Sequence, residues 1–259
     1  MLKQSALKIV SECISLARLQ LKEKPGLRIF TYHSIGSSAY GDCSGLNTVS
    51  IKSFIQHMDV VASIRSVPLN ELVISQDELN ISITFDDGYA DNLYVAAPLL
   101  ADRKIPYTVF VATGFIKNKT KGFLTSNELR QLSIAPGATI GAHGDKHINL
   151  TLCSKKTLKS EIEGSKKYLE DLLGRAVEEF AYPYGLADMR VRNAVLEAGY
   201  KVAACSRFDI NKPNRDNLML NRCVVLSSDT MRSFQQKIFG DYDWYRWRYK
   251  DPLNIKGVK

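Results

Sequence analysis

Short apolar runs alternate with amphipathic segments along most of the chain. Runs rich in β-branched and aromatic residues predict strands over residues 27–33, 81–85, 107–112, 139–142, 179–182, 200–204 and 218–226. Apolar residues recurring every three or four positions predict helices over residues 51–61, 91–103, 125–133, 155–173, 188–198 and 230–239. Because the connections are too long for hairpins, the pattern indicates an α/β fold with a mostly parallel sheet, either open or closed into a barrel.

The two ends of the chain differ from this alternating middle. Residues 4–23 carry apolar side chains at helical spacing and stop before a Pro-Gly pair, which predicts a separate N-terminal helix within residues 1–24. Residues 241–259 form a basic, aromatic tail that contains the stretch YDWYRWRYK. No repeat or linker interrupts residues 25–240, so we predict one α/β domain there, with a helix before it and a helical tail after it.

The composition is that of a globular protein, with 259 residues of which 45% are hydrophobic and 24% charged. The apolar runs are too short to cross a bilayer. Five widely spaced cysteines without a C-x-x-C pair favour reduced thiols and argue against a cysteine metal site. Charged residues interrupt the first 24 positions, which lack the apolar core of a signal peptide, so we expect a cytoplasmic protein.

The formal net charge is +8, and a basic surface suits nucleic acid, anionic lipid or an anionic glycan as a partner. The charges are scattered rather than massed, which predicts a solvated surface and no nucleic-acid partner. Packing on the domain is the commoner outcome for both the N-terminal helix and the aromatic tail. The helix could instead lie against a partner or a membrane, and the tail could lie on an anionic membrane, stack on a glycan or contact nucleic acid.

Chemically active residues follow several predicted strands. They are His33, Asp86 with Asp87, His143 with His147, and the Pro183-Tyr184-Gly185 turn. Parallel α/β folds carry their sites at the C-terminal edge of the sheet, so these groups are expected to share one site. Asp-Asp-Gly alone is ordinary turn chemistry, and the coincidence at one edge is what favours a functional role.

The spacing of the histidines is compatible with a metal ion. His143 and His147 are four residues apart, so one helical turn would let both imidazoles face one ion, although such pairs are also common on protein surfaces. Neighbouring strand residues point to opposite faces, so Asp86 and Asp87 reach one site only if the chain turns there, which Gly88 permits. One carboxylate would then bind the metal, and the other would act as a base.

These residues, in this order, resemble the polysaccharide deacetylase family, the carbohydrate esterases that share the chitooligosaccharide-deacetylase homology domain. TFDDG (84–88) resembles the first family motif, H-x-x-x-H (143–147) the second, and FAYPYG (180–185) the third, within a similarity that covers about residues 27–226. The resemblance implies an irregular (β/α) barrel of about seven mostly parallel strands. It also implies a divalent metal ion, usually zinc, at the strand ends.

The resemblance assigns a role to each matching residue. Asp87, His143 and His147 would bind the metal, and Asp86 would be the general base. The backbone N–H of Tyr184 would help to hold the oxyanion.

The substrate side of the site is expected near the third motif. Pro183, Tyr184 and Tyr89 would border the sugar, although aromatic residues near strand ends are more often packing residues.

Two departures from the family pattern concern the proton-transfer groups. The arginine that commonly precedes the proline of the third motif by two residues is replaced by Ala181, and no histidine follows His147 to act as the late acid. Permuted branches of the family place that histidine on the first strand, which makes His33 the candidate acid. Arg222 is a candidate to replace the missing arginine or to contact substrate, and its alternative is a surface or structural charge.

The expected function is metal-dependent hydrolysis of an N-acetyl group on an amino sugar, with release of acetate. The partner would be an N-acetylated glycan of a bacterial polysaccharide, or its lipid- or nucleotide-linked precursor. The same machinery could serve a deformylase or another non-peptide amide hydrolase. A catalytically silent glycan-binding protein on this fold is the alternative from another class.

Overall fold

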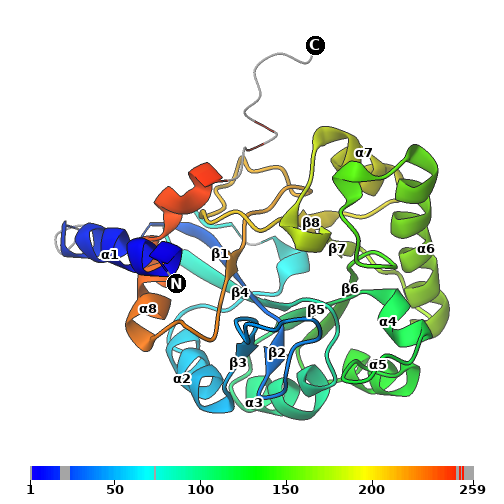
Figure 1. Cartoon of the computed structure of the whole chain (residues 1–259), viewed down its shortest axis with the longest axis horizontal. Helices are drawn as coiled ribbons and strands as arrows, with labels where there is room; N and C mark the ends of the chain where they lie inside the picture. Colours follow the sequence, from blue (N-terminus) through cyan, green and yellow to red (C-terminus); the bar gives the residue numbers. More distant parts are fainter. Residues whose placement is uncertain (1, 18–23, 73, 249–250, 252, 254–259) are drawn as a thin grey trace.

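A curled, seven-stranded parallel sheet forms the centre of the molecule (Figure 1), in the order β8-β7-β6-β5-β4-β1-β9. The computed structural model describes residues 2–17, 24–72, 74–248, 251 and 253. The strands are β1 (Gly26–Tyr32), β4 (Leu79–Phe85), β5 (Tyr107–Val111), β6 (Ala138–Ala142), β7 (Glu179–Ala181), β8 (Val202–Ala204) and β9 (Cys223–Val224). The predicted α/β fold, an irregular (β/α) barrel of about seven mostly parallel strands, is confirmed.

Helices cover the outer face of the sheet (Figure 1). They are α2 (Ile51–Val61), α3 (Ala97–Asp102), α4 (Thr113–Lys117), α5 (Ser126–Ser133), α6 (Lys155–Leu173), α7 (Met189–Glu197) and α8 (Met231–Phe239). Capping residues determine where several of these helices begin or end. Thr125 and Glu128 form a capping box at the start of α5, and Gly174 ends α6 in the left-handed conformation.

The alternation of side chains along the strands divides the core into two parts. Side chains on the outer face of the sheet pack under the helices and include Phe30, Ile83 and Val109. Side chains on the inner face fill the barrel and form a smaller cluster with Leu27, Ile29, Phe110, Ala181, Val202, Ala204 and Leu220. Successive strand residues point to opposite faces, so both parts follow from the strand period.

The last strand differs from its prediction over residues 218–226, because β9 contains only Cys223 and Val224. Leu220 makes a single bridge to β8, whereas Cys223 and Val224 pair with β1. One segment thus crosses from one edge of the sheet to the other and closes the barrel. A chain that crosses between two strands cannot stay paired along either of them, which explains the short strand.

The N-terminal helix, α1 (Leu2–Ala17), packs against α8 and the C-terminal tail. Glu12 pairs with Arg232 of α8, and the indole N–H of Trp244 donates a hydrogen bond to Ser11. Trp244 belongs to a 3₁₀ segment, η5 (Asp243–Arg248). The rest of the predicted helix, residues 18–23, lies outside the described residues. Within the described part of the chain, no helix is both long and apolar enough to cross a membrane.

Candidate active site

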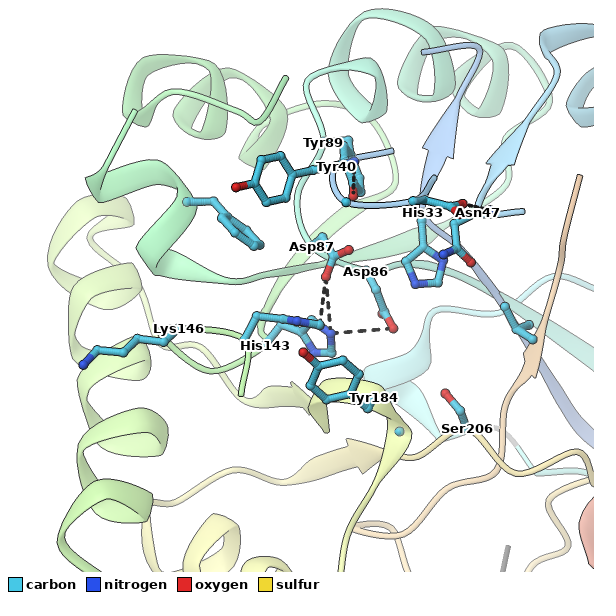
Figure 2. Close-up of a pocket in the computed structure, with 16 residues that line it drawn as sticks. His33, Tyr40, Asn47, Asp86, Asp87, Tyr89, His143, Lys146, Tyr184 and Ser206 are labelled. Carbon is cyan, nitrogen blue, oxygen red and sulfur yellow. Dashed lines mark hydrogen bonds and ion pairs between the residues drawn. The ribbon is translucent and has the colours of Figure 1, made fainter. Parts of the chain in front are cut away.

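A pocket of about 630 Å³ opens at the C-terminal edge of the sheet. Seven of the residues singled out in the sequence line it, as Figure 2 shows for most of them: His33, Asp86, Asp87, Tyr89, His143, His147 and Tyr184. They come from the loops after β1, β4, β6 and β7. Parallel strands bring their C-terminal ends to one edge, so residues more than 100 positions apart in the chain meet there.

A tight turn after β4 presents both aspartates to the pocket. β4 ends at Phe85, and the next residues include Asp87 and Gly88 with φ angles of 74° and 83°. The turn expected at Gly88 therefore begins one residue earlier, with Asp87 itself in the left-handed region. A left-handed conformation is costly for most residues but is better tolerated by aspartate, and it rotates the second carboxylate toward the first.

Arg222 holds the first of these carboxylates in a bidentate ion pair. Its two terminal nitrogens lie 2.7 Å and 2.8 Å from the two oxygens of Asp86. The guanidinium is fully buried, and its Nε donates to the carbonyl oxygen of Cys205. Burial raises the pKa of Asp86, but the Arg222 guanidinium outweighs that effect, and the pKa falls to about 2.

The predicted contact of Arg222 with substrate is wrong, because Arg222 is 0% exposed and does not line the pocket. Its side chain reaches Asp86 from beneath the pocket floor. Ala181, where the family usually has arginine, points into the barrel core instead. The missing positive charge is thus supplied by the residue that immediately precedes β9, at the edge of the sheet far from β7.

The second carboxylate converges with the two histidines. Asp87 Oδ1 lies 3.6 Å from His143 Nε2 and 3.3 Å from His147 Nε2, and one ligand atom from each residue lies within 4.8 Å of the others (Figure 2). Asp87 Oδ1 is buried and accepts no hydrogen bond from the described residues. A buried acceptor facing two imidazole nitrogens is the arrangement that a cation would complete.

Hydrogen bonding and burial prepare His143 as a ligand. Its Nδ1 lies 2.7 Å from the carbonyl oxygen of Ala181, so Nδ1 carries the proton and the lone pair of Nε2 faces Asp87. Burial lowers the pKa of His143 to about 3 and also lowers that of His147, so both rings are neutral near pH 7. Burial raises the pKa of Asp87 to about 6, and a bound cation would oppose that shift.

The two histidines do not lie on one helical turn, so that part of the prediction is wrong. β6 ends at Ala142, and the chain then forms a loop in which Gly144 and His147 have φ angles of 72° and 51°. These left-handed residues fold the loop back on itself. The rings come together with centroids 5.0 Å apart, the result that a helical turn was expected to give.

Glu161 on α6 supports this loop, and the sequence analysis missed it. Its carboxylate accepts the backbone N–H groups of Asp145 and Lys146, each at 2.8 Å, and it is 2% exposed. The signal was present in the sequence. Glu161 lies within the apolar face of α6, next to Ile162, where a charged residue needs a specific partner.

His33 follows β1 and lies on the other side of the carboxylates from His143 in the view of Figure 2. Its Nδ1 is buried and has no hydrogen-bond partner within the described part of the chain. Asn92 donates to its backbone carbonyl oxygen at 3.0 Å, which fixes the position of the main chain. The structure thus places an imidazole in the pocket opposite the candidate metal ligands.

The third motif forms a 3₁₀ turn, η4 (Pro183–Gly185), at the edge of the pocket. Tyr184 has a φ of 59° and a ring that is 59% exposed and packs 4.7 Å from the ring of His147. Gly185 approaches Ser206 so closely that a Cβ would lie 2.2 Å from the serine side chain. Pro183 is buried and does not line the pocket, so the structure does not support a substrate contact for it.

Aromatic residues form the pocket wall on the side of Asp87 that faces away from His143 (Figure 2). Tyr89 is 3% exposed, stacks on Phe123 and accepts a hydrogen bond from the backbone N–H of Tyr40, so it is mainly a packing residue. Tyr40 itself is 63% exposed and packs near Phe115. Tyr40, Asp42 and Asn47 come from the loop before β3 (Thr48–Val49), which pairs with β2 (Ser34–Ile35). The sequence of that loop contains no motif that predicts a place in the pocket for these three residues.

A family model described as "Polysaccharide deacetylase" matches residues 74–203. The chain belongs to the polysaccharide deacetylase family. Members of this family are hydrolases of carbon–nitrogen bonds, the enzyme class that the sequence predicts. The polysaccharide deacetylase match includes Asp86 to Tyr184 but leaves His33 and Arg222 outside, so their places in the site come from the structure.

Individual relatives agree with this family. The Bacillus subtilis protein YxkH, which is named as a polysaccharide deacetylase, is 28% identical over 191 residues, covering 70% of this chain and 64% of the relative. This chain therefore spans slightly less than two thirds of that relative. A chitooligosaccharide deacetylase of Azorhizobium caulinodans is 29% identical over 150 residues, or 56% of this chain and 68% of the relative.

Solved structures show the same fold. The Streptococcus pyogenes deacetylase PplD, in complex with acetate, superposes with a TM-score of 0.72 at 22% identity. The match covers 82% of this chain and 98% of that one. At this level of identity the likeness establishes the fold of a polysaccharide deacetylase, and the chemistry must be argued from the site.

Proposed function

We propose that this polysaccharide deacetylase hydrolyses the N-acetyl group of an amino sugar in a metal-dependent reaction that releases acetate. The observation that carries the proposal is the different partnership of the two adjacent aspartates. Asp86 is paired with Arg222, whereas Asp87 converges with two neutral histidines. Asp86 is therefore suited to accept a proton, and Asp87 is suited to bind a metal ion.

The residues present fit a divalent metal ion, and we propose zinc. Asp87, His143 and His147 would hold it through one carboxylate oxygen and two imidazole nitrogens, a donor set that zinc favours. The buried, unpartnered Oδ1 of Asp87 is the structural sign of such an ion. When bound, the ion would lower the pKa of a coordinated water toward ~7 and polarise the substrate carbonyl.

Asp86 would accept the proton of the attacking water. Its carboxylate must stay ionised although it is only 4% exposed, and the Arg222 guanidinium provides the compensating charge. The bidentate pair also fixes the direction of both oxygens, since a planar guanidinium holds a carboxylate in one orientation. A positioned base of this kind accelerates such reactions by about 10²–10⁴.

His33 would protonate the departing nitrogen. As the water oxygen bonds to the carbonyl carbon and the carbon–nitrogen bond breaks, the amine needs a proton, because an amide anion is a poor leaving group. His33 is the remaining pocket imidazole once His143 and His147 are assigned to the metal. The backbone N–H of Tyr184, in the turn at the pocket edge, would donate to the developing oxyanion. The products are a free amine and acetate.

The substrate we propose is an N-acetylated glycan or a lipid- or nucleotide-linked sugar precursor. The pocket volume exceeds that of one acetamido group, and the exposed rings of Tyr40 and Tyr184 flank its mouth with surfaces suited to sugar faces. The chitooligosaccharide deacetylase relative supports the N-acetylated class. We also propose action in the cytoplasm, which the scattered cysteines without a C-x-x-C pair support.

The experiment is acetate release from N-acetylated chitooligosaccharides and from lipid- and nucleotide-linked N-acetylhexosamines, after chelation and reloading with zinc, cobalt or manganese. Asp86→Asn should lower turnover by at least about 10² with the metal retained, whereas His143→Ala should lose the metal. Metal retention and full activity in both variants would overturn the assignment. Glycan binding without metal or acetate release would instead identify a silent binding protein.

A further inference from the structure

The N-terminal helix α1 has two apolar stripes on opposite sides. Leu7, Ser11 and Ile14 follow the i, i+4, i+7 spacing on the side that faces the domain, where Ser11 is fully buried and Leu7 packs against the core. Ile9, Cys13 and Leu16 follow the same spacing two positions later. At 100° per residue, that offset puts them on the opposite side.

The second stripe faces solvent. Ile9 is 65% exposed and Leu16 is 58% exposed, Val10 beside them is 40% exposed, and Cys13 is also exposed. We call these four residues the outer stripe. None of the described residues covers it, and α1 needs only its inner side to dock. A single exposed leucine is ordinary, but three apolar residues aligned along one helix face, with Val10 flanking them, indicate a contact surface.

The surroundings of α1 point to an anionic membrane surface as the occupant. Trp247, in η5 next to α1, is 81% exposed, and tryptophan is the side chain that favours the membrane–water interface. Lys8 on α1 is exposed and donates to the carbonyl oxygen of Ser228. The side chains of Lys24 and Arg246 are 52% and 39% exposed and form ion pairs with Asp243 and Asp209. The chain as a whole carries +8, so its long-range field attracts anionic lipid.

A second copy of the chain fits this surface less well. A stable interface buries roughly 800 Å² on each partner, and four side chains on a 16-residue helix present less apolar area than that. Interfacial insertion has no such threshold, because its strength grows with apolar area and adds to the attraction of basic residues.

We infer that the outer stripe of α1, together with Trp247, inserts into the headgroup region of an anionic bilayer and holds the deacetylase barrel at that surface. The helix lies along the surface and does not cross it. The inference is independent of the hydrolytic activity, since no residue of the pocket takes part. It would place the enzyme where lipid-linked sugar precursors are found.

The test is co-sedimentation of the full chain with vesicles of phosphatidylcholine alone and of an equimolar mixture with phosphatidylglycerol. The wild type should bind the mixed vesicles and release at high salt. Ile9→Glu and Leu16→Glu should each lower the partition coefficient about tenfold or more. Ile134→Glu is the matched control, because Ile134 is 83% exposed at the end of α5, across the molecule from α1 (Figure 1), and should bind like the wild type.

Fluorescence gives a second readout, because the two tryptophans of the chain, Trp244 and Trp247, both lie in η5. Their emission should shift to shorter wavelength on binding, and the shift should be reduced in Trp247→Phe. The inference is overturned if the wild type binds neither kind of vesicle, or if the α1 variants bind the vesicles as well as Ile134→Glu does. It is equally overturned if sedimentation velocity shows a wild-type dimer that Ile9→Glu dissociates.

Discussion

Arg222 and Asp86 form a fully buried, bidentate ion pair between residues 136 positions apart in the chain, with nitrogen–oxygen distances of 2.7 Å and 2.8 Å. The pair joins the segment that closes the barrel to the loop that carries the candidate base. Closure of the barrel and ionisation of the base are thereby coupled. A defect in the pair should affect both stability and the pH dependence of turnover.

Arg222→Met should leave Asp86 buried without its counter-charge. The pKa of Asp86 should then rise from about 2, because burial raises it and the largest effect that opposes burial, the Arg222 charge, is lost. The acid limb of the kcat/KM profile should move to higher pH, and the free energy of unfolding should fall by about 3–5 kcal/mol. The pH–rate profile and denaturant titrations measure the two effects.

Asp86→Asn supplies the control for that prediction, through a double-mutant cycle. With the charge of Asp86 removed, Arg222→Met should cost much less stability than it does in the wild type, because no buried charge is left unpaired. Additive stability losses in the cycle would contradict the coupling, as would an acid limb that stays in place.

His33→Ala should lower amide turnover by about 10²–10⁴ and leave the metal content unchanged. The loss should be far smaller for an aryl acetate ester, because a phenolate leaves without being protonated. The measurement is the ratio of amide to ester hydrolysis in the variant and in the wild type. An equal loss on both substrates would show that His33 does something other than donate the leaving-group proton.

Glu161→Leu should weaken metal binding by about 10–100-fold, because the backbone N–H groups of Asp145 and Lys146 lose the carboxylate that positions the loop between the two histidines. Glu161→Gln keeps an acceptor oxygen and should be closer to the wild type. Competition against a chromogenic chelator measures the affinity. If both variants bind metal like the wild type, the loop does not depend on Glu161.

Glu179 on β7 should make stability depend on pH. Burial raises its pKa to about 7 from the ordinary value of 4.5. The folded state therefore binds more protons than the unfolded state between these values, and the stability present below pH 4.5 is lost as the pH rises through about 7.

The glutamine in Glu179→Gln cannot ionise. The free energy of unfolding of this variant should therefore increase relative to that of the wild type as the pH rises, by up to roughly 3 kcal/mol. Thermal or urea unfolding of both proteins at pH 5 and pH 8 measures the change. A stability difference that is the same at both pH values would contradict the predicted titration.

Features that depend on short-range pattern could be predicted from the residues alone. The strand and helix periods gave the α/β class, and the motifs around Asp86, His143 and Tyr184 fell at strand ends. Parallel strands must bring such ends to one edge, so the residues of the pocket were predictable as a group. Where local geometry mattered, the prediction was less reliable, as the non-helical loop between His143 and His147 shows.

The remaining contacts of the site follow from the folded arrangement of the whole domain. The pattern marked Glu161 as a buried charge in need of a partner and Arg222 as a candidate counter-charge, but it could not tell that Glu161 would bind the histidine loop or that Arg222 would reach Asp86. No local signal placed Tyr40 at the pocket mouth. Such contacts depend on how the ends of the sheet curl toward each other and on where a helix packs, and both follow from the packing of the whole core. The spacing of apolar residues likewise predicted the helix α1. Which of its two apolar stripes faces solvent depends on how the helix packs on the domain.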